Sequence, residues 1–264
     1  MEMIQFKAEM KTAKLEPGEV ERRKLDATRV QLSHDVSRTP DAIIQRYREN
    51  QNWRLYQKEW IYKNLLTNGA EVLDFGCGTG EITTQLAILG AKKVYAVDVT
   101  PGLLAATSAR AELDNVSDRV ETVCGFIENI PPRPVDLVVA FAVLHHCHPI
   151  SKIMPTLLNW LRPGGTFVCA EPVVYFPVVE TLRVASRVKF EPLDEGERKL
   201  DATDVDYLLG CLDDAQCIPF RLTSRADRWL PDRPLRRLDN LLFKLPVMSK
   251  LAGGMVLHGR KKAG

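Results

Sequence analysis

The nine residues Leu73–Glu81, with the sequence LDFGCGTGE, decide the fold of this chain. Val72, Leu73 and Phe75 are apolar and predict a short buried strand. Glycines follow directly, and glycine permits a sharp turn and a close approach of the backbone to a ligand. The loop glycines are Gly76, Gly78 and Gly80. A strand, a glycine loop and a helix in this order predict a nucleotide-type cofactor site.

An acidic residue follows the next predicted strand. Lys93–Val97 has the pattern of a short strand, and Asp98 comes directly after it, 18 positions beyond Gly80. This is near the spacing of about 20 residues at which a carboxylate accepts hydrogen bonds from ribose hydroxyls. We therefore expect Asp98 and the glycine loop to hold the same cofactor.

The spacing of the glycines indicates which cofactor. Dinucleotide folds use GxGxxG, so that a pyrophosphate lies against the helix amides. Here the position of the third dinucleotide glycine holds Glu81, whose carboxylate would repel a pyrophosphate. A cofactor without phosphates is therefore favoured. The alternative is a glycine turn that binds nothing, which would leave Asp74 and Asp98 without a role.

The pattern GxGxG plus Glu81 resembles motif I of the class I methyltransferases, which bind S-adenosylmethionine. Later segments resemble the fourth strand (135–139), its loop (143–146) and the turn into the fifth strand (161–167) of small-molecule members, so the resemblance covers about residues 70 to 172. It implies S-adenosylmethionine as cofactor, with Asp74 near its amino-acid end. The cofactor-binding residues it implies are Asp74, Gly76, Cys77, Gly78, Gly80, Asp98, Val99, Phe126, Ile127, Phe141 and Tyr47.

Strands and helices alternate through the middle of the chain. Helical patterns cover 82–89, 102–112 and 150–161; strand patterns cover 94–97, 120–123, 136–141 and 166–170, with a turn at 162–165. Such alternation predicts an α/β fold with a doubly wound, mostly parallel sheet, and the resemblance implies the seven-stranded Rossmann-like methyltransferase form. We expect an N-terminal arm and helical cap (1–66) and a cofactor-binding core (67–264), with lid insertions at about 173–197 and 231–250.

One segment departs from the family pattern. Members often place an acidic residue after the third strand to bind the adenine amino group, but this chain has Gly125-Phe126-Ile127-Glu128 there. We expect backbone groups around Phe126 and Ile127 to meet the adenine edge, with the Phe126 ring adding apolar surface. The alternative is that Phe126 is only a core residue.

Candidate bases follow the fourth and fifth strands. Methyl transfer needs aligned reactants and, for a hydroxyl acceptor, removal of a proton. His145 and His146 are imidazoles suited to proton transfer near neutral pH, and Glu171 follows the fifth strand. These three are the candidate catalytic residues. Alternatively the histidines only pack or hydrogen-bond the loop, and Glu171 is a loop carboxylate. No metal site is expected, because no carboxylate stands at a ligand spacing.

Two further segments are candidates for closing the pocket. After the fifth strand, Tyr175 and Phe176 are the expected substrate contacts. Pro231–Leu245 carries leucines that we place on one face of an amphipathic helix: Leu235, Leu238, Leu241, Leu242 and Leu245. Residues 221–244 hold seven basic and three acidic side chains. This basic run fits an anionic partner, although a solvated face is the usual reason for such runs.

The composition is ordinary for a soluble globular protein. The 264 residues are 45% hydrophobic and 27% charged, with a formal net charge of +2, which gives no overall attraction to nucleic acid or membrane. The longest apolar run is too short to span a bilayer. Six cysteines form no CxxC pair and are expected to be reduced. We expect a cytoplasmic protein with no membrane partner.

Three functions are open on the sequence. The first is methylation of a small, hydrophobic or aromatic metabolite on oxygen, nitrogen or carbon, as in natural-product biosynthesis. The second is RNA methylation, but Ala140–Val143 stands where base-amine methyltransferases carry an Asn/Asp-Pro-Pro-aromatic motif, so nucleic acid is not the expected partner. The third uses the cofactor site for binding or for chemistry other than methyl transfer.

Overall fold

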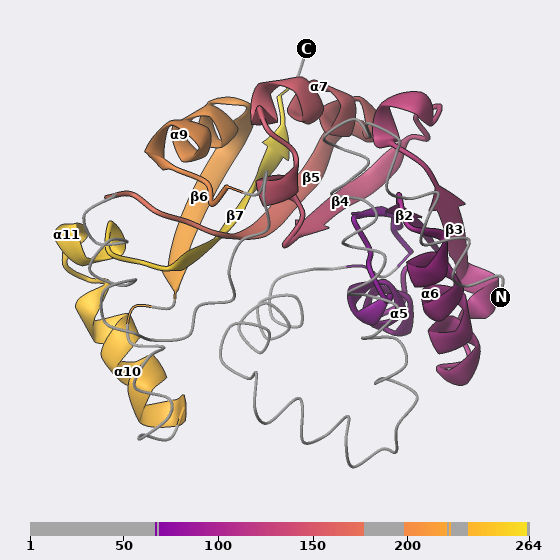
Figure 1. Cartoon of the computed structure of the whole chain (residues 1–264), viewed down its shortest axis with the longest axis horizontal. Helices are drawn as coiled ribbons and strands as arrows, with labels where there is room; N and C mark the ends of the chain where they lie inside the picture. The colour runs from indigo at the N-terminus through magenta and orange to yellow at the C-terminus, as the bar shows by residue number, and fades with distance from the viewer. Residues whose placement is uncertain (1–66, 68, 177–197, 221, 223–231, 263–264) are drawn as a thin grey trace, which may run out of the picture.

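The computed structural model describes Thr67 and residues 69–176, 198–220, 222 and 232–262 (Figure 1). Within these residues seven strands form one sheet in the order β3-β2-β1-β4-β5-β7-β6. All neighbouring pairs are parallel except those of β7, which is antiparallel to β5 and β6. The prediction of a mostly parallel, seven-stranded sheet is confirmed. The strands are β1 (Glu71–Phe75), β2 (Lys93–Asp98), β3 (Val120–Cys124), β4 (Val135–Phe141), β5 (Leu161–Pro172), β6 (Leu212–Phe220) and β7 (Gly254–Lys261).

Helices cover both faces of the sheet. On one face α7 and α9 pack into a large apolar cluster, and on the other α5 and α6 do (Figure 1). The helices are α5 (Glu81–Ile88), α6 (Pro101–Leu113), α7 (Ile150–Trp160), α9 (Ala202–Gly210), α10 (Asp232–Leu242) and α11 (Pro246–Ser249). Short 3-10 turns are η1 (Ser117–Arg119), η2 (Ile127–Asn129) and η3 (Leu144–His146).

The central strand β4 is buried on both sides. Val138 and Ala140 belong to the cluster under α7 and α9, while Leu137, Val139 and Phe141 belong to the cluster under α5 and α6. A continuous apolar run is what a central parallel strand requires, because helices exclude water from both of its faces.

The predicted turn at 162–165 lies inside β5 as an irregularity. Leu161 pairs with Val135 and Thr166 pairs with Leu137, so four residues of β5 stand opposite the single residue Asp136. Arg162 from this bulge donates to Asp136 at 2.7 Å and to Glu71 at 2.6 Å. The chain therefore begins pairing before the turn, and the expected strand (166–170) is too short.

A helix, α10, lies in the segment where an amphipathic helix is predicted, but most of its leucines are not covered by the described residues. Leu235 is buried, whereas Leu238, Leu241 and Leu245 are 42%, 61% and 54% exposed. The buried side of the helix is completed by Asp239 instead. Of the basic run, Arg237 and Lys244 are exposed, and the side chains of its other basic members lie outside the described residues.

The predicted N-terminal cap (1–66), including Tyr47, lies outside the described residues, as does most of the first predicted lid. Among the residues that are described, no helix has the length and apolar character needed to cross a membrane.

Candidate active site

The glycine loop uses its backbone N–H groups internally. Gly76 and Cys77 both donate to the carbonyl of Val97, at 2.8 and 3.1 Å. The N–H of Gly78 donates to Oδ2 of Asp98 at 3.0 Å. A loop that binds phosphate must point several free N–H groups at the anion. These three groups are already taken, so the geometry fits a cofactor without phosphates, as Glu81 predicts.

Two of the loop glycines are required by close packing. All three have positive φ, and a Cβ on Gly76 would lie 2.3 Å from Cγ2 of Val143 in the loop after β4. A Cβ on Gly80 would lie 2.7 Å from Cγ2 of Thr107 in α6. A Cβ on Gly78 would meet nothing within 4 Å. Gly78 therefore borders open space, which is where a ligand could approach the backbone.

Asp98 lies at the end of β2 and is buried. Its Oδ2 accepts from Gly78, and its Oδ1 accepts from the N–H of Thr100 at 2.9 Å. Each carboxylate oxygen has a second lone pair, so both can still accept from vicinal ribose hydroxyls. The hydroxyl of Thr100 is buried without a hydrogen-bond partner among the described residues. This orphaned hydroxyl beside Asp98 fits the presence of a polar cofactor.

Asp74 lies below the loop in β1 and is 2% exposed. Burial, opposed by a 2.5 Å hydrogen bond from Thr83 Oγ1, raises its pKa to about 7. The neighbouring charge of Asp98 raises the pKa further. A buried carboxylate held this way gains from a cation, so the site fits the ammonium group expected at the amino-acid end of S-adenosylmethionine.

Three other predicted cofactor residues point into the protein. The thiol of Cys77 lies in a small apolar cluster with Ala96 and Leu104, and burial raises its pKa. Phe141 and Ile127 lie in the two large clusters. Any cofactor contact of these three would come mainly from backbone atoms.

Phe126 and Val99 lie nearer to solvent. Phe126 is 45% exposed at the start of η2, just beyond the end of β3. The alternative that Phe126 is only a core residue is therefore wrong. Val99 is half-buried between Asp98 and Thr100. Both stand on the side of the loop where the adenosine end of the cofactor is expected.

Glu171, at the end of β5, organises the loop after β4. Its Oε1 accepts from the N–H groups of Val143 and Leu144 at 2.9 and 2.8 Å, and its Oε2 lies 2.8 Å from Nδ1 of His145. With an ionised carboxylate, Nδ1 carries the proton and donates, so Nε2 of His145 holds a lone pair. The side chain of Glu171 is fully buried. It therefore orients His145 and is not placed to contact substrate.

The loop that carries His145 is conformationally unusual. Ala142, directly after β4, has a φ of 53°, which is uncommon for a residue with a Cβ. Its N–H donates to the carbonyl of Ala170 at 2.9 Å. The ring of His146 lies 4.0 Å, centroid to centroid, from that of His145. Such strain is often kept where a loop must present a functional group.

Arg198 connects this loop to the segment before α9. Its N–H donates to the carbonyl of His145 at 3.2 Å, and its own carbonyl lies 2.8 Å from Nε2 of His148. Its guanidinium pairs with Asp201 and Asp204 at 2.6 and 2.8 Å. Arg198 therefore lies beside the loop that carries His145, and Leu200, two residues further on, pairs with Val173.

The two residues after β5 that are expected to contact substrate differ in their positions. Tyr175 turns inward, with its hydroxyl 3.9 Å from Sγ of Cys217, and burial raises its pKa. This position does not suit a substrate contact. Phe176 is 43% exposed and remains a candidate.

Three residues of the site were not predicted from the sequence. Thr100, Ala142 and Arg198 gave no motif of their own, although a threonine before Pro101 is a usual helix N-terminus signal. Among the described residues no cluster of histidine, cysteine or acidic side chains could hold a metal ion, and the six cysteines are free thiols.

Comparison with known proteins agrees with this geometry. Residues 72–165 match the family model of the methyltransferase domain. Ribosomal protein L11 methyltransferase of Acinetobacter baumannii (strain SDF) is 33% identical over 143 residues, which cover 53% of this chain and 46% of that protein. The chain thus spans less than half the length of this curated relative.

Solved structures share the fold at low identity. Magnesium protoporphyrin IX methyltransferase (ChlM) of Synechocystis PCC 6803, with bound S-adenosylhomocysteine, matches with a TM-score of 0.59 and 14% identity, covering 93% of this chain and 100% of that one. The [4+2]-cyclase SpnF matches with a TM-score of 0.56 and 20% identity, covering 80% and 81%.

Fold, glycine loop and family match together define a class I methyltransferase domain. Residues 72–165 of the chain therefore belong to a domain of the S-adenosylmethionine-dependent methyltransferase type.

Proposed function

We propose that this protein transfers a methyl group from S-adenosylmethionine to a hydroxyl or amine of a small, hydrophobic or aromatic metabolite, with His145 as general base. The observation that carries the proposal is the buried pair of His145 and Glu171 at the end of the central strands. Asp98 and Thr100 would hold the ribose, and Asp74 the ammonium group. When bound, the cofactor supplies an electrophilic methyl group on a positively charged sulfur.

The residues of the chain then have distinct roles. Glu171 fixes the protonated Nδ1 of His145 and leaves Nε2 as the acceptor of a proton. The acceptor atom of the substrate bonds to the methyl carbon while its proton passes to Nε2, and S-adenosylhomocysteine leaves. A positioned base typically contributes about 10²–10⁴-fold to such a rate. Val143 and Leu144 keep the loop in place through their N–H bonds to Glu171.

A small acceptor fits the narrow access to this base. The side chain of His145 is only 11% exposed, so the reacting group must enter a confined space. The chain carries no overall charge excess that would attract nucleic acid. A cytoplasmic location belongs to the same proposal.

A protein acceptor is the second candidate, because the curated relative is named for methylation of a ribosomal protein. The two are separated by one experiment. Purified protein is incubated with S-adenosylmethionine labelled on the methyl group, together with either the metabolite extract or the macromolecular fraction of the same cells. We expect label in the extractable metabolites and equimolar S-adenosylhomocysteine. Label retained only in protein would overturn the small-molecule assignment.

Chemistry without methyl transfer is the remaining alternative, since a neighbour with the same fold is a [4+2]-cyclase. Turnover of an added metabolite without formation of S-adenosylhomocysteine would establish that alternative. The His145→Ala variant supplies the control: it should lose methyl transfer while still binding S-adenosylhomocysteine, because His145 is not among the residues predicted to bind the cofactor.

A further inference from the structure

The connection between β6 and β7 carries a group of exposed apolar side chains. Within the described residues, four of the ten exposed large apolar side chains lie in the short stretch 238–247. They are Leu238, Leu241, Leu245 and Val247, with exposed fractions of 42%, 61%, 54% and 67%. Single exposed apolar residues are common on protein surfaces, whereas a contiguous exposed group marks a surface that contacts a partner.

The geometry of α10 brings three of these side chains together. Leu238, Leu241 and Leu245 are three and four residues apart, so they lie in a row along one side of a helix. The helical turn continues to Leu245, whose N–H donates to the carbonyl of Leu242 at 2.9 Å. The buried residue Leu235 lies on the side of α10 that packs on the protein. The leucine row is therefore a separate side of the helix that faces outward.

The exposed charges around this row are all positive. Arg237, Lys244 and Lys250 are exposed, whereas the single acidic residue of the stretch 234–250, Asp239, is buried. Arg237 and Lys244 are seven residues apart, which places both on one side of the helix, next to the leucine row. We call these three cations and the four exposed apolar side chains the α10–α11 face. Its charge favours an anionic partner.

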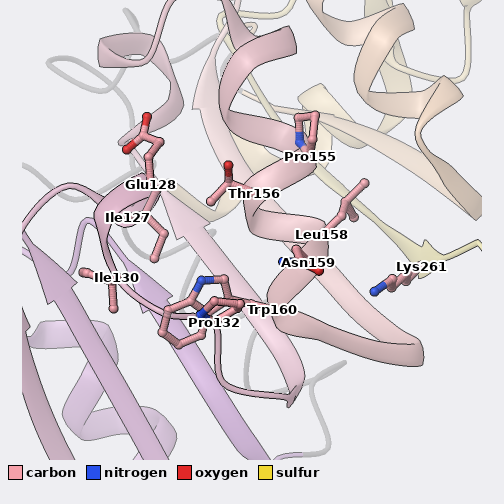
Figure 2. A pocket seen from close by; sticks show the side chains of 10 residues that line it. All are labelled: Ile127, Glu128, Ile130, Pro132, Pro155, Thr156, Leu158, Asn159, Trp160 and Lys261. Atoms are coloured by element: carbon pink, nitrogen blue, oxygen red, sulfur yellow. The ribbon is translucent and has the colours of Figure 1, made fainter.

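Another apolar surface shows that this excess of positive charge is local. A pocket of about 530 Å³ between α7 and η2 is lined by apolar residues such as Ile127, Ile130 and Leu158, and Glu128 and Lys261 line it as well (Figure 2). The two charged side chains of this pocket have opposite signs, so the pocket favours neither an anionic nor a cationic partner. The α10–α11 face differs in having cations alone.

The α10–α11 face lies at the edge of the sheet that carries the candidate active site. Phe220 at the end of β6 pairs with Gly254 at the start of β7, and Gly254 pairs with Pro172 at the end of β5. The connection that contains α10 and α11 therefore leaves and rejoins the sheet beside the end of β5, where Glu171 lies. Figure 1 shows α10 extending from this edge, beyond the ends of β6 and β7.

We propose that the α10–α11 face binds the surface of a membrane that contains anionic lipids. The leucine row and Val247 enter the boundary between headgroups and acyl chains, and the cations pair with the lipid phosphates, as in amphipathic helices that lie on a bilayer. A bilayer is a deformable surface, which suits a helix that projects from the edge of the sheet. The helix lies on the membrane and does not span it, since no described helix is long and apolar enough to cross one.

This proposal replaces the expectation that the protein has no membrane partner. That expectation came from the net charge of the whole chain and the length of its longest apolar run. Neither property detects a small face on which exposed leucines and cations occur together. Membrane binding does not depend on methyl transfer, so the two are tested separately.

Sedimentation with lipid vesicles tests the proposal on the full-length protein. One set of vesicles contains equal parts of phosphatidylglycerol, which is anionic, and phosphatidylcholine, and the other contains phosphatidylcholine alone. We expect the protein to sediment with the mixed vesicles and to bind them at least about tenfold more tightly than vesicles of phosphatidylcholine alone. No cofactor or methyl acceptor is present in this measurement.

Two variants test the apolar and the cationic part of the face. Leu241→Gln and Lys244→Gln should each weaken binding to the mixed vesicles by at least about threefold. The matched controls are Leu113→Gln in α6, at a side chain that is 83% exposed, and Lys152→Gln, at an exposed residue of α7. Both helices lie apart from α10 (Figure 1). The controls should bind as the unmodified protein does, and thermal denaturation checks that all four variants are folded.

Several results would overturn the proposal. It is wrong if the protein does not sediment with the mixed vesicles, or if it binds vesicles of phosphatidylcholine alone equally well. It is also wrong if Leu241→Gln binds the mixed vesicles as tightly as the unmodified protein. A dimer in analytical ultracentrifugation that Leu241→Gln dissociates, without any binding to vesicles, would instead assign the α10–α11 face to a second copy of this chain.

Discussion

The carboxylate of Glu171 and the imidazole of His145 form a buried pair, with Oε2 2.8 Å from Nδ1. The same carboxylate holds the loop that carries the histidine, through the N–H groups of Val143 and Leu144. Position and protonation of the candidate base therefore depend on one side chain.

The Glu171→Gln variant separates these two roles. The amide oxygen would accept from the two loop N–H groups, which turns the amide NH₂ toward Nδ1 and moves the imidazole proton to Nε2. We expect kcat to fall by about 10²-fold, while the affinity for S-adenosylhomocysteine changes by less than about threefold. Steady-state kinetics and calorimetry measure both. An unchanged kcat would exclude His145 as the base.

Asp98→Asn tests the ribose contact. The amide keeps the shape of the carboxylate but has only one accepting oxygen, so it cannot accept from the ribose and both backbone N–H groups equally well. Loss of hydrogen bonds to a charged group costs about 1.5–3 kcal/mol, or roughly 10- to 100-fold in the Kd for S-adenosylhomocysteine. Asp118→Asn, at a side chain that is 77% exposed, is the control and should leave the Kd unchanged. Equal affinity of the two variants would contradict the assignment.

Asp74 gives the empty protein a distinctive pH dependence. Its folded pKa of about 7 lies above the ordinary 3.8, so the folded state binds a proton more tightly than the unfolded state. The free energy of unfolding should therefore decrease as pH rises from about 4 to about 7, by an amount on the order of 3 kcal/mol. In Asp74→Asn this contribution disappears, and the variant should be the more stable protein at pH 8 but not at pH 4. Urea denaturation at both pH values measures this, and parallel pH profiles would contradict it.

The loop glycines offer a matched pair. Gly76→Ala would place a methyl group 2.3 Å from Val143, so the loop after β4 must shift, and we expect a loss of stability above about 2 kcal/mol. Gly78→Ala meets no neighbour, so it costs only the strain of its positive φ, about 1–2 kcal/mol. The second variant should still fold but bind S-adenosylhomocysteine more weakly, since its methyl group enters the space next to the loop. Thermal denaturation measures the stability of the two variants, and calorimetry measures their affinity for S-adenosylhomocysteine. If Gly78→Ala bound S-adenosylhomocysteine as tightly as the unmodified protein, the cofactor would not occupy the space next to Gly78.

Much of the cofactor half of the site could be predicted from the sequence, because its residues are close to strand ends that apolar patterns reveal. Asp74, Gly76 and Asp98 flank short apolar runs, and parallel strands bring such ends to one edge of the sheet. The hydrogen bond between His145 and Glu171 could not be predicted from local sequence patterns. It depends on the register in which Phe141 lies opposite Ala170, so that the residues following each strand become neighbours.

Other features depend on tertiary packing alone. The spacing of the leucines in α10 does not show that Leu235 is buried and Leu241 is exposed. The buried side of this helix includes the polar residue Asp239 as well as Leu235, so apolar spacing does not reveal it. The bulge in β5 likewise follows from Arg162 reaching both Asp136 and Glu71. Trp160 reads as an ordinary core residue in sequence, and only its surroundings show that its N–H lacks an acceptor within the described structure.

The internal hydrogen bonds of the glycine loop set a limit on redesign. Replacing Glu81 by glycine would restore the spacing of a dinucleotide motif on paper. The N–H groups of Gly76 and Cys77 would still be committed to Val97, and that of Gly78 to Asp98. A change of cofactor preference toward a dinucleotide would require the backbone to be rebuilt, and therefore a different length or path of the connection between β1 and α5. The geometry of the main chain therefore determines which cofactor this loop can bind, and replacing a single side chain does not change that geometry.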